Sequence, residues 1–411
     1  MHGATHRTAS ISLLLACIVL LSAPPVSSAG AFEPAEQLVT SQADLIDNEF
    51  SQSRRMMTWA DADGRIWVAG VDPVTGLFVP PNGKGILVDP DGLATGDLGV
   101  VGNGPEWIST ASGDQIVYTK FLRGLPRTAQ NARLAMALRL GGGSWQPGFL
   151  SVESRRNAPY ASHDGGDALP RISYVDPEGN HYWRNLFDPA SERMVADVPS
   201  SFRSLRFTEG QRSAVFVAPV NGVSQVFLHD LGTGTSLQVT GDGGQKDLNS
   251  VPWVWRAPEY GGARVLMTIV NYTELRLYRE PMRGEPAQRS WSLLLSARTP
   301  QGGIISSPEP FTHGGRSYAV LTATMPPQIT PSVVFLVVLD PAHPEMRQLS
   351  PDLPLRTRRD PEVFVTEDGP WIYYNRFDAG TLFCITCNEG VYRSWTGLGP
   401  EERRDPASQD G

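Results

Sequence analysis

The sequence has few cysteines, few lysines and only one long apolar run, and each shortage excludes a class of protein. Its 411 residues include three cysteines, too few for a fold held together mainly by disulfides. Lysine occurs only at Lys84, Lys120 and Lys246, so nearly all basic residues are arginine. The formal net charge of -8 argues against a general nucleic-acid binder. No transmembrane segment is expected, because no apolar run beyond the N-terminal one is long enough to span a bilayer.

The one long apolar run lies near the N-terminus and has the layout of a secretory signal peptide. Arg7 precedes an apolar segment from Ile11 to Leu21, and Ala29 and Ala31 follow with the A-x-A spacing of a cleavage site. We therefore expect residues 1–31 to be a cleaved signal peptide. The mature protein would then be secreted or periplasmic.

The three cysteines allow more than one interpretation. Cys17 ends a Leu-Leu-Ala-Cys segment that loosely resembles a lipobox, but the apolar run continues past it, which favours the signal peptide over lipidation. Cys384 and Cys387 belong to the mature chain, where a disulfide is allowed. Three residues of extended chain span about 10 Å and a disulfide needs Cα atoms within about 7 Å, so a bridge requires a turn. We expect two structural cysteines, either bridged or free.

A β-rich pattern repeats about every fifty residues through most of the chain. Each copy has a short, often Pro-led strand, a Gly-containing turn and a second strand, and hairpin segments follow. The copies begin at Glu49, Gly104, Ala158, Phe202, Val251, Ser307 and Asp360. No later segment has convincing helical periodicity, and even the Ala- and Leu-rich stretch from Arg127 to Leu140 is interpreted as loop plus strand. The pattern predicts an all-β fold, a single β-propeller of about seven (six to eight) four-stranded blades.

The repeats also predict the domain organisation. One copy is too small to bury its own faces, so the stacked copies form one domain. We expect a signal peptide over residues 1–31, an N-terminal extension over 32–48, the propeller over 49–398 and a disordered tail over 399–411. The first copy is the least regular, which leaves six blades plus an extension as an alternative. We expect a monomer.

Several copies resemble the WD40-like (PD40) repeats of TolB-type propellers. The segments PEWISTASGDQIVYT, VSQVFLHDLGTGTSLQVTGDGG and VPWVWRAPEYGGARVLMTI carry this resemblance, which covers the chain from about Glu49 to Gly397. It implies a propeller fold and leaves the function open. TolB proteins also carry an N-terminal α/β domain, for which the segment between residue 31 and the first copy is too short. The chain is therefore not expected to be TolB itself.

Motifs of several enzyme classes are missing from the sequence. Some TolB-like propellers cap a serine peptidase, which needs a G-x-S-x-G nucleophile elbow, and no such pentapeptide occurs. No P-loop, G-x-G-x-x-G or H-E-x-x-H occurs either. We therefore exclude a serine peptidase and assign no catalytic residue.

Carboxylates and aromatic residues occur near the starts of the copies, where a propeller's innermost strands meet one mouth of the central channel. Three copies begin with Pro-Glu, and other copies place aromatic residues there. The predicted ligand-binding residues are Glu106, Trp107, Tyr160, Trp253, Glu309, Asp360 and Glu362, with Trp255 nearby. Such a mouth suits a sugar or a divalent cation. Alternatively, Pro-Glu simply begins a strand and leaves its glutamate in water.

Two functions remain open on these residues. The first is an exported binding or scaffold module for a protein or glycan partner. The alternative is a propeller-fold carbohydrate-active enzyme, a glycoside hydrolase or polysaccharide lyase that uses carboxylates at the channel mouth. The segment RDPEVFVTEDGPWIYY also resembles the opening strands of five-bladed glycoside hydrolases, although about seven copies are counted here.

No cofactor is required by the sequence, and calcium is the one candidate. Asp61-Ala62-Asp63-Gly64 and Asp89-Pro90-Asp91-Gly92 resemble parts of calcium loops, but such loops need more oxygen ligands, and D-x-D-G between strands favours a hairpin turn. His163 and His313 are interpreted as turn residues. Asn271 begins a glycosylation sequon within a predicted strand.

Overall fold

The computed structural model describes most of the chain beyond the predicted signal peptide. The described residues are 32–42, 46–79, 85–90, 104–150, 153, 155–162, 169–199, 204–210, 212–247, 250–282, 290–324, 331–379 and 387–401. The chain divides into two units, residues 1–33 and residues 34–411, and the fold is that of the second. The predicted signal peptide, Cys17 and residues 402–411 of the predicted tail lie outside the described residues, so those predictions stay predictions.

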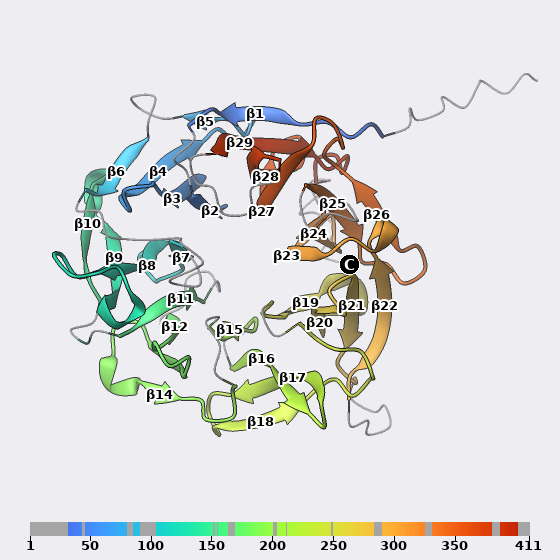
Figure 1. Cartoon of the computed structure of the whole chain (residues 1–411), viewed down its shortest axis with the longest axis horizontal. Helices are drawn as coiled ribbons and strands as arrows, with labels where there is room; N and C mark the ends of the chain where they lie inside the picture. Colours follow the sequence, from blue (N-terminus) through green and yellow to red (C-terminus); the bar gives the residue numbers. More distant parts are fainter. Residues whose placement is uncertain are drawn as a thin grey trace, which may run out of the picture. The chain divides into compact units, whose positions relative to one another are not determined.

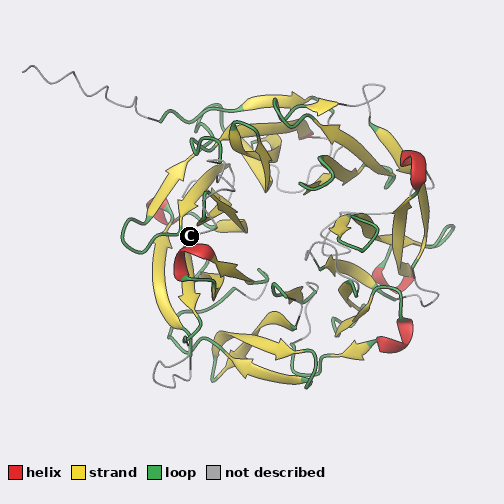
Figure 2. Cartoon of the chain, turned by 180° about the vertical axis from the view of Figure 1, so that it is seen from behind, coloured by secondary structure: helices red, strands yellow, loops and turns green. Residues whose placement is uncertain are grey.

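The described residues of the second unit form seven antiparallel sheets arranged as the blades of a β-propeller (Figure 1). Apart from five 3-10 turns of three residues each, the elements described there are strands. Figure 2 shows the same arrangement from behind, with strands predominating. The predicted all-β, seven-bladed propeller is confirmed. Among the described residues, no helix has the length and apolarity needed to cross a bilayer.

The first three blades follow one another along the chain. Blade 1 contains β2 (Ile46–Ser51), β3 (Met56–Ala60), β4 (Ile66–Val71) and β5 (Phe78–Val79), and β6 (Ile86–Asp89) also pairs with β4. Blade 2 contains β7 (Glu106–Ile108), β8 (Gln115–Phe121), β9 (Ala132–Arg139) and β10 (Trp145–Phe149). Blade 3 contains β11 (Asn157–Ala161), β12 (Arg171–Val175), β13 (His181–Asn185) and β14 (Arg193–Met194). The predicted strand within residues 127–140 is thus β9.

The next three blades repeat the order, and the seventh combines both ends of the unit. Blade 4 contains β15 (Arg206–Phe207), β16 (Ser213–Val220), β17 (Val223–Asp230) and β18 (Thr235–Gln238). Blade 5 contains β19 (Trp253–Ala257), β20 (Ala263–Val270), β21 (Glu274–Arg279) and β22 (Ser292–Arg298). Blade 6 contains β23 (Ile305–His313), β24 (Arg316–Thr324), β25 (Ser332–Val338) and β26 (Glu345–Gln348). Blade 7 contains β27 (Arg356–Thr366), β28 (Gly369–Asp378), β29 (Asn388–Trp395) and β1 (Gln37–Thr40).

Strand composition follows the place of each strand in its blade. The middle strands β16 and β25 read SAVFVAPV and SVVFLVV and are buried along most of their length. Such near-continuous apolar runs fit strands covered on both faces. The outer strand β18 reads TSLQ and alternates exposed with half-buried residues.

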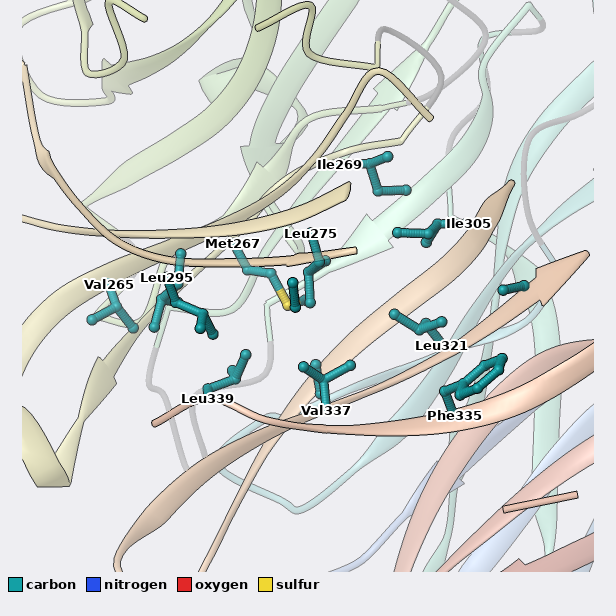
Figure 3. Close-up of a cluster of buried hydrophobic side chains, with 14 of the residues drawn as sticks. Val265, Met267, Ile269, Leu275, Leu295, Ile305, Leu321, Phe335, Val337 and Leu339 are labelled. Carbon is teal, nitrogen blue, oxygen red and sulfur yellow. The ribbon is translucent and has the colours of Figure 1, made fainter. Parts of the chain in front are cut away.

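The main hydrophobic clusters lie between blades. Figure 3 shows Val265, Met267, Leu275 and Leu295 of blade 5 near Leu321, Phe335 and Val337 of blade 6, all in one buried cluster. The largest core therefore belongs to two blades jointly. This sharing explains why one repeat alone cannot form a stable domain.

The ring is closed by its N-terminal strand. β1 pairs antiparallel with β29 and forms the outer edge of blade 7. The segment over residues 32–48, predicted as an extension ahead of the propeller, thus contributes β1 to the last blade, and β2 already begins at Ile46. The physical reason is that an unpaired outer edge of β29 would leave its backbone groups without partners.

A buried ion-pair network fastens this closing segment. The Glu36 carboxylate accepts hydrogen bonds from Arg358 Nε at 3.0 Å and from Arg376 Nη1 at 2.6 Å. The Arg358 side chain is 0% exposed and that of Glu36 is 8% exposed. Although burial opposes ionisation, the two guanidinium groups hold the pKa of Glu36 below its ordinary value. We call Glu36, Arg358 and Arg376 the closing network.

Two sequence expectations concern the surface and the cysteines. The Asn271 sequon was expected in a strand, but Asn271 and Tyr272 have φ of 50° and 61° and form the exposed turn between β20 and β21. Positive φ at both central residues matches the twist of a tight hairpin, and asparagine tolerates it.

Cys387 is disulfide-bonded. Its predicted partner Cys384 lies outside the described residues.

Candidate functional site

The innermost strands of four blades share one irregularity, a bulge at a non-glycine residue with positive φ. Pairing with the second strand shifts register in β2, β11, β23 and β27. The bulge residues are Asp47 (φ 54°), Ala158 (φ 51°), Ser307 (φ 44°) and Asp360 (φ 56°). Pairing resumes two residues later, at Glu49, Tyr160, Glu309 and Glu362. A bulge changes the direction in which the following side chain points, so these four residues occupy equivalent positions in their blades.

The other three innermost strands begin at the corresponding place without such a shift. Their first residues are Glu106 of β7, Arg206 of β15 and Trp253 of β19. Each blade thus contributes one residue to a set that we call the central residues: Glu49, Glu106, Tyr160, Arg206, Trp253, Glu309 and Glu362. The innermost strands of neighbouring blades contact one another in sequence from β19 through β23, β27, β2, β7 and β11 to β15.

The central residues divide into two chemically different groups. Blades 6, 7, 1 and 2 supply four glutamates, and the bulge residues Asp47 and Asp360 join them. We call these six carboxyl groups the acidic half. Blades 3, 4 and 5 supply Tyr160, Arg206 and Trp253, which we call the arginine half.

Electrostatic coupling between distant blades shows that these side chains converge. Burial raises the pKa of Glu49 in blade 1, and the charges of Glu106 and then of Glu309 in blade 6 raise it further. Glu106 in blade 2 raises the pKa of Glu309, and Arg206 in blade 4 lowers it. Residues from blades that are not neighbours can interact in this way only if they point toward the centre of the ring.

Burial and mutual repulsion raise the pKa of carboxyl groups in the acidic half. Desolvation raises the pKa of Glu309 to about 8; Arg206 opposes this shift, and Asp360 and Glu106 add to it. A hydrogen bond joins the Glu309 and Glu362 carboxyl groups. Desolvation, followed by the charge of Glu309, raises the pKa of Glu362 well above its ordinary value. Some of these groups therefore remain protonated at neutral pH.

The two aspartates form a second carboxyl pair. Desolvation and then the charge of Asp360 raise the pKa of Asp47, and a hydrogen bond joins the two carboxyl groups. The backbone N–H of Gly104 donates to Asp47 Oδ2 and opposes the shift. The Glu49 pKa is raised by desolvation first and then by Glu106. Carboxyl pairs formed by blades 6, 7 and 1 thus share protons.

The arginine half places a cation between aromatic rings. Arg206 Cζ lies 3.4 Å from the ring centroid of Trp253 and 5.0 Å from that of Tyr160. Such contacts stabilise and orient a guanidinium. Arg206 Nη1 is nevertheless buried without a hydrogen-bond partner, and Arg206 forms no ion pair within the described part of the chain. An unsatisfied buried donor at this place needs an explanation.

The structure brings together most of the predicted site residues. Glu106, Tyr160, Trp253, Glu309, Asp360 and Glu362 all belong to the two halves, while their predicted role in ligand binding stays a prediction. Trp107 is 4% exposed and packs against Trp145 in a core cluster, and its Nε1 donates to Glu49 O at 2.9 Å. Strand alternation explains this, because residues adjacent to a central residue point to the other face.

Sequence reasoning missed Asp47, Glu49 and Arg206. Glu49 begins the first and least regular copy, which has no Pro-Glu pair to mark the central position. In most copies the central residue lies two positions after the start of the copy. The copy in blade 4 begins at Phe202, so this rule points to Ser204 rather than to Arg206. Aligning the copies on the turn after the first strand would have found both Glu49 and Arg206.

The acidic turns considered for calcium already have protein partners. The Asp61 carboxylate accepts bonds from the backbone N–H of Asp63 at 3.0 Å and of Arg65 at 2.8 Å, and from Trp67 Nε1 at 2.8 Å. Asp89 accepts from Lys120 Nζ and the Tyr118 hydroxyl, both at 2.6 Å; Asp91 and Gly92 lie outside the described residues. Within the described ranges, no group of three His, Cys, Asp or Glu side chains has a geometry that could hold a metal ion.

The histidines considered for the site lie elsewhere. His313 Nε2 is hydrogen-bonded to Gly399 O at 2.8 Å, near the end of β23. His163 is outside the described residues. His313 thus joins the segment after β29 to blade 6; it is the buried last residue of β23, so its interpretation as a turn residue is wrong by one position.

Comparisons with known proteins identify the class of fold. The sequence matches no protein-family model and no curated protein. The β-propeller domain of Cps50 (Swd1) from Myceliophteria thermophila superimposes with a TM-score of 0.53 at 10% identity, covering 88% of this chain and 99% of that one. This similarity and the seven blades place the chain among the β-propellers.

Other solved structures match more loosely. The dihydro-heme d1 dehydrogenase NirN gives a TM-score of 0.44 at 14% identity, covering 87% of this chain and 66% of that one. A putative TolB from Agrobacterium tumefaciens gives 0.36 at 13% identity, covering 59% and 79%.

Proposed function

We propose that the protein is an exported β-propeller that acts as a binding module, with its binding site at the centre of the propeller. The observation that carries this proposal is the convergence of the acidic half and the arginine half from all seven blades. Concentrating six carboxyl groups and one unpaired guanidinium there destabilises the fold, since desolvated charges and unsatisfied donors are costly. A ligand that pairs with these groups would offset that cost.

The proposal is tested by thermal unfolding of residues 32–411 with a panel of oligosaccharides, peptides and calcium. A ligand at about a hundred times its Kd adds about 2.7 kcal/mol to the free energy of unfolding. We expect one class to raise Tm, and Glu49→Gln to remove the shift. Glu345→Gln, in an exposed pair with Arg347, is the matched control and should retain it. If no member shifts Tm, or if both variants behave alike, the proposed site is wrong.

A second candidate function is a carbohydrate-active enzyme, favoured by one observation. Glu309 keeps its proton at neutral pH beside Glu362, and a protonated carboxyl is what a general acid requires. This candidate predicts turnover of an oligosaccharide that Glu309→Gln abolishes while binding persists. A binding module has no turnover to lose.

A further inference from the structure

Arg206 holds the only positive charge among the central residues and has no partner for it there. Its guanidinium lies against Trp253 and near Tyr160, and Nη1 is buried without an acceptor. A guanidinium presents five donors in a planar fork that matches a carboxylate. The unsatisfied nitrogen lacks an acceptor within the described part of the chain, and a ligand carboxylate would supply one.

The neighbouring carboxyl groups do not fill this role. The charge of Arg206 reaches Glu309, since it lowers the pKa of Glu309, yet no carboxylate within the described part of the chain forms an ion pair with Arg206. The aromatic rings of Trp253 and Tyr160 hold the guanidinium at its own side of the centre. The fold thus leaves Arg206 without an ion pair to the acidic half.

The acidic half requires the opposite charge. Its groups are Asp47, Glu49, Glu106, Glu309, Asp360 and Glu362, and at least four of them interact unfavourably with one another. A purely anionic ligand would add to this repulsion. A ligand with an ammonium group would instead let the glutamates ionise against it.

We infer that the centre of the propeller binds a zwitterionic peptide group whose carboxylate pairs with Arg206 and whose ammonium lies among Glu49, Glu309 and Glu362. This inference rests on the proposed function, because it names the ligand class of the same site. The two charges could come from the termini of a short free peptide or from lysine and acidic side chains of a partner protein. The chemistry is the same in both cases.

Calorimetric titration of residues 32–411 with four peptides tests the inference. The probes are triglycine, N-acetyl-triglycine without an ammonium, triglycine amide without a carboxylate, and acetyl-Lys-Gly-Glu-amide with charges only on side chains. Triglycine should bind, and each blocked form should bind about 10- to 100-fold more weakly, as loss of a charge-assisted hydrogen bond predicts. If the side-chain probe binds and triglycine does not, the result supports the inference and identifies a partner protein as the source of the two charges.

Variants link each charge of the ligand to one half of the site. Arg206→Gln should weaken triglycine about 10- to 100-fold but should not further weaken triglycine amide, because the pair is already lost. Glu362→Gln should likewise weaken triglycine without affecting N-acetyl-triglycine. Arg298→Gln is the matched control, since the Arg298 side chain is 77% exposed at the end of β22. Melting curves establish that each variant folds.

Two results would overturn the inference. One is equal affinity for triglycine and both blocked forms; the other is triglycine binding that Arg206→Gln leaves unchanged. If no peptide binds but an uncharged oligosaccharide does, and Glu362→Gln weakens that binding, the zwitterionic ligand is wrong and the proposed function stands. If no probe binds at all, both are wrong.

Discussion

At the scale of single residues, the centre of the propeller contains ionisable side chains that are buried away from water. Glu309 and Glu362 share a hydrogen bond, and Asp47 and Asp360 share another. Two carboxyl groups can share a hydrogen bond only if one of them holds a proton. The protonation state of this region is therefore a property of its pairs, and neutralising one member changes the other.

Glu309 should make stability depend on pH. Its pKa is near 8 in the fold and near 4.3 in the unfolded chain, so the native state binds more protons between these values. The free energy of unfolding should therefore fall as pH rises from about 5 to 8. Glu309→Gln should flatten this profile and be more stable than the wild type at pH 8, by at least about 1 kcal/mol. Urea unfolding at several pH values measures this, and parallel profiles for both proteins would contradict it.

At the scale of elements, the bulges of β2, β11, β23 and β27 are the device that aims the central residues. Each uses a non-glycine residue at positive φ, which costs about 1–2 kcal/mol for most side chains. Aspartate at two of the four positions tolerates this conformation better than alanine or serine at the others. The strained position recurs in four blades, so it belongs to the repeated structure of the innermost strands.

The bulge at Ser307 gives a test of this strain. Ser307→Gly should leave the free energy of unfolding unchanged or raise it by up to about 1 kcal/mol, because glycine accepts φ of 44° without a Cβ clash. Ser307→Val should lower it by about 1–2 kcal/mol, since a β-branched side chain is disfavoured there. Chemical denaturation distinguishes them. Equal stability of the two variants would mean that the bulge relaxes.

Among the contacts between elements, the closing network should be the one whose loss lowers the free energy of unfolding most. Glu36→Ala leaves the buried Arg358 without its carboxylate, while Arg376 keeps its ion pair with Glu389, and breaking a buried pair in this way costs about 3–5 kcal/mol. Glu345→Ala is the matched control, because its pair with Arg347 is solvent-exposed and is worth less than about 1 kcal/mol. Denaturant midpoints measure both losses. Similar losses for the two variants would show that β1 is held by backbone pairing alone.

At the scale of the whole unit, shared cores should make unfolding cooperative. Val265 of blade 5 and Phe335 of blade 6 belong to one cluster, so neither blade can lose its packing alone. Tryptophan fluorescence and far-UV circular dichroism should therefore give coincident urea transitions. Glu36→Ala should shift both probes together. Two separated transitions would show that blades unfold independently.

The fold could be predicted from the sequence because short local patterns, mainly glycine and proline, mark the strands and the turns that end them. Pro-led strands and glycine turns recur in a period that alone implies stacked blades. The site could be predicted only in part. Pro-Glu at Glu309 and Glu362 marks the central place, but Asn48-Glu49 and Leu205-Arg206 lack the proline. That Glu309 and Glu49 meet from blades 6 and 1 depends on ring closure, which no local pattern encodes.

Pairing of β1 with β29 also sets the timing of folding. β1 is the first strand of the propeller in chain order and β29 is the last, so β1 must stay unpaired until all the other strands have been synthesised. The six other blades can assemble in order, but the ring stays open during that interval. An exposed strand edge is also where other chains attach. Residues 37–40 are therefore an open strand edge until β29 is available to pair with them.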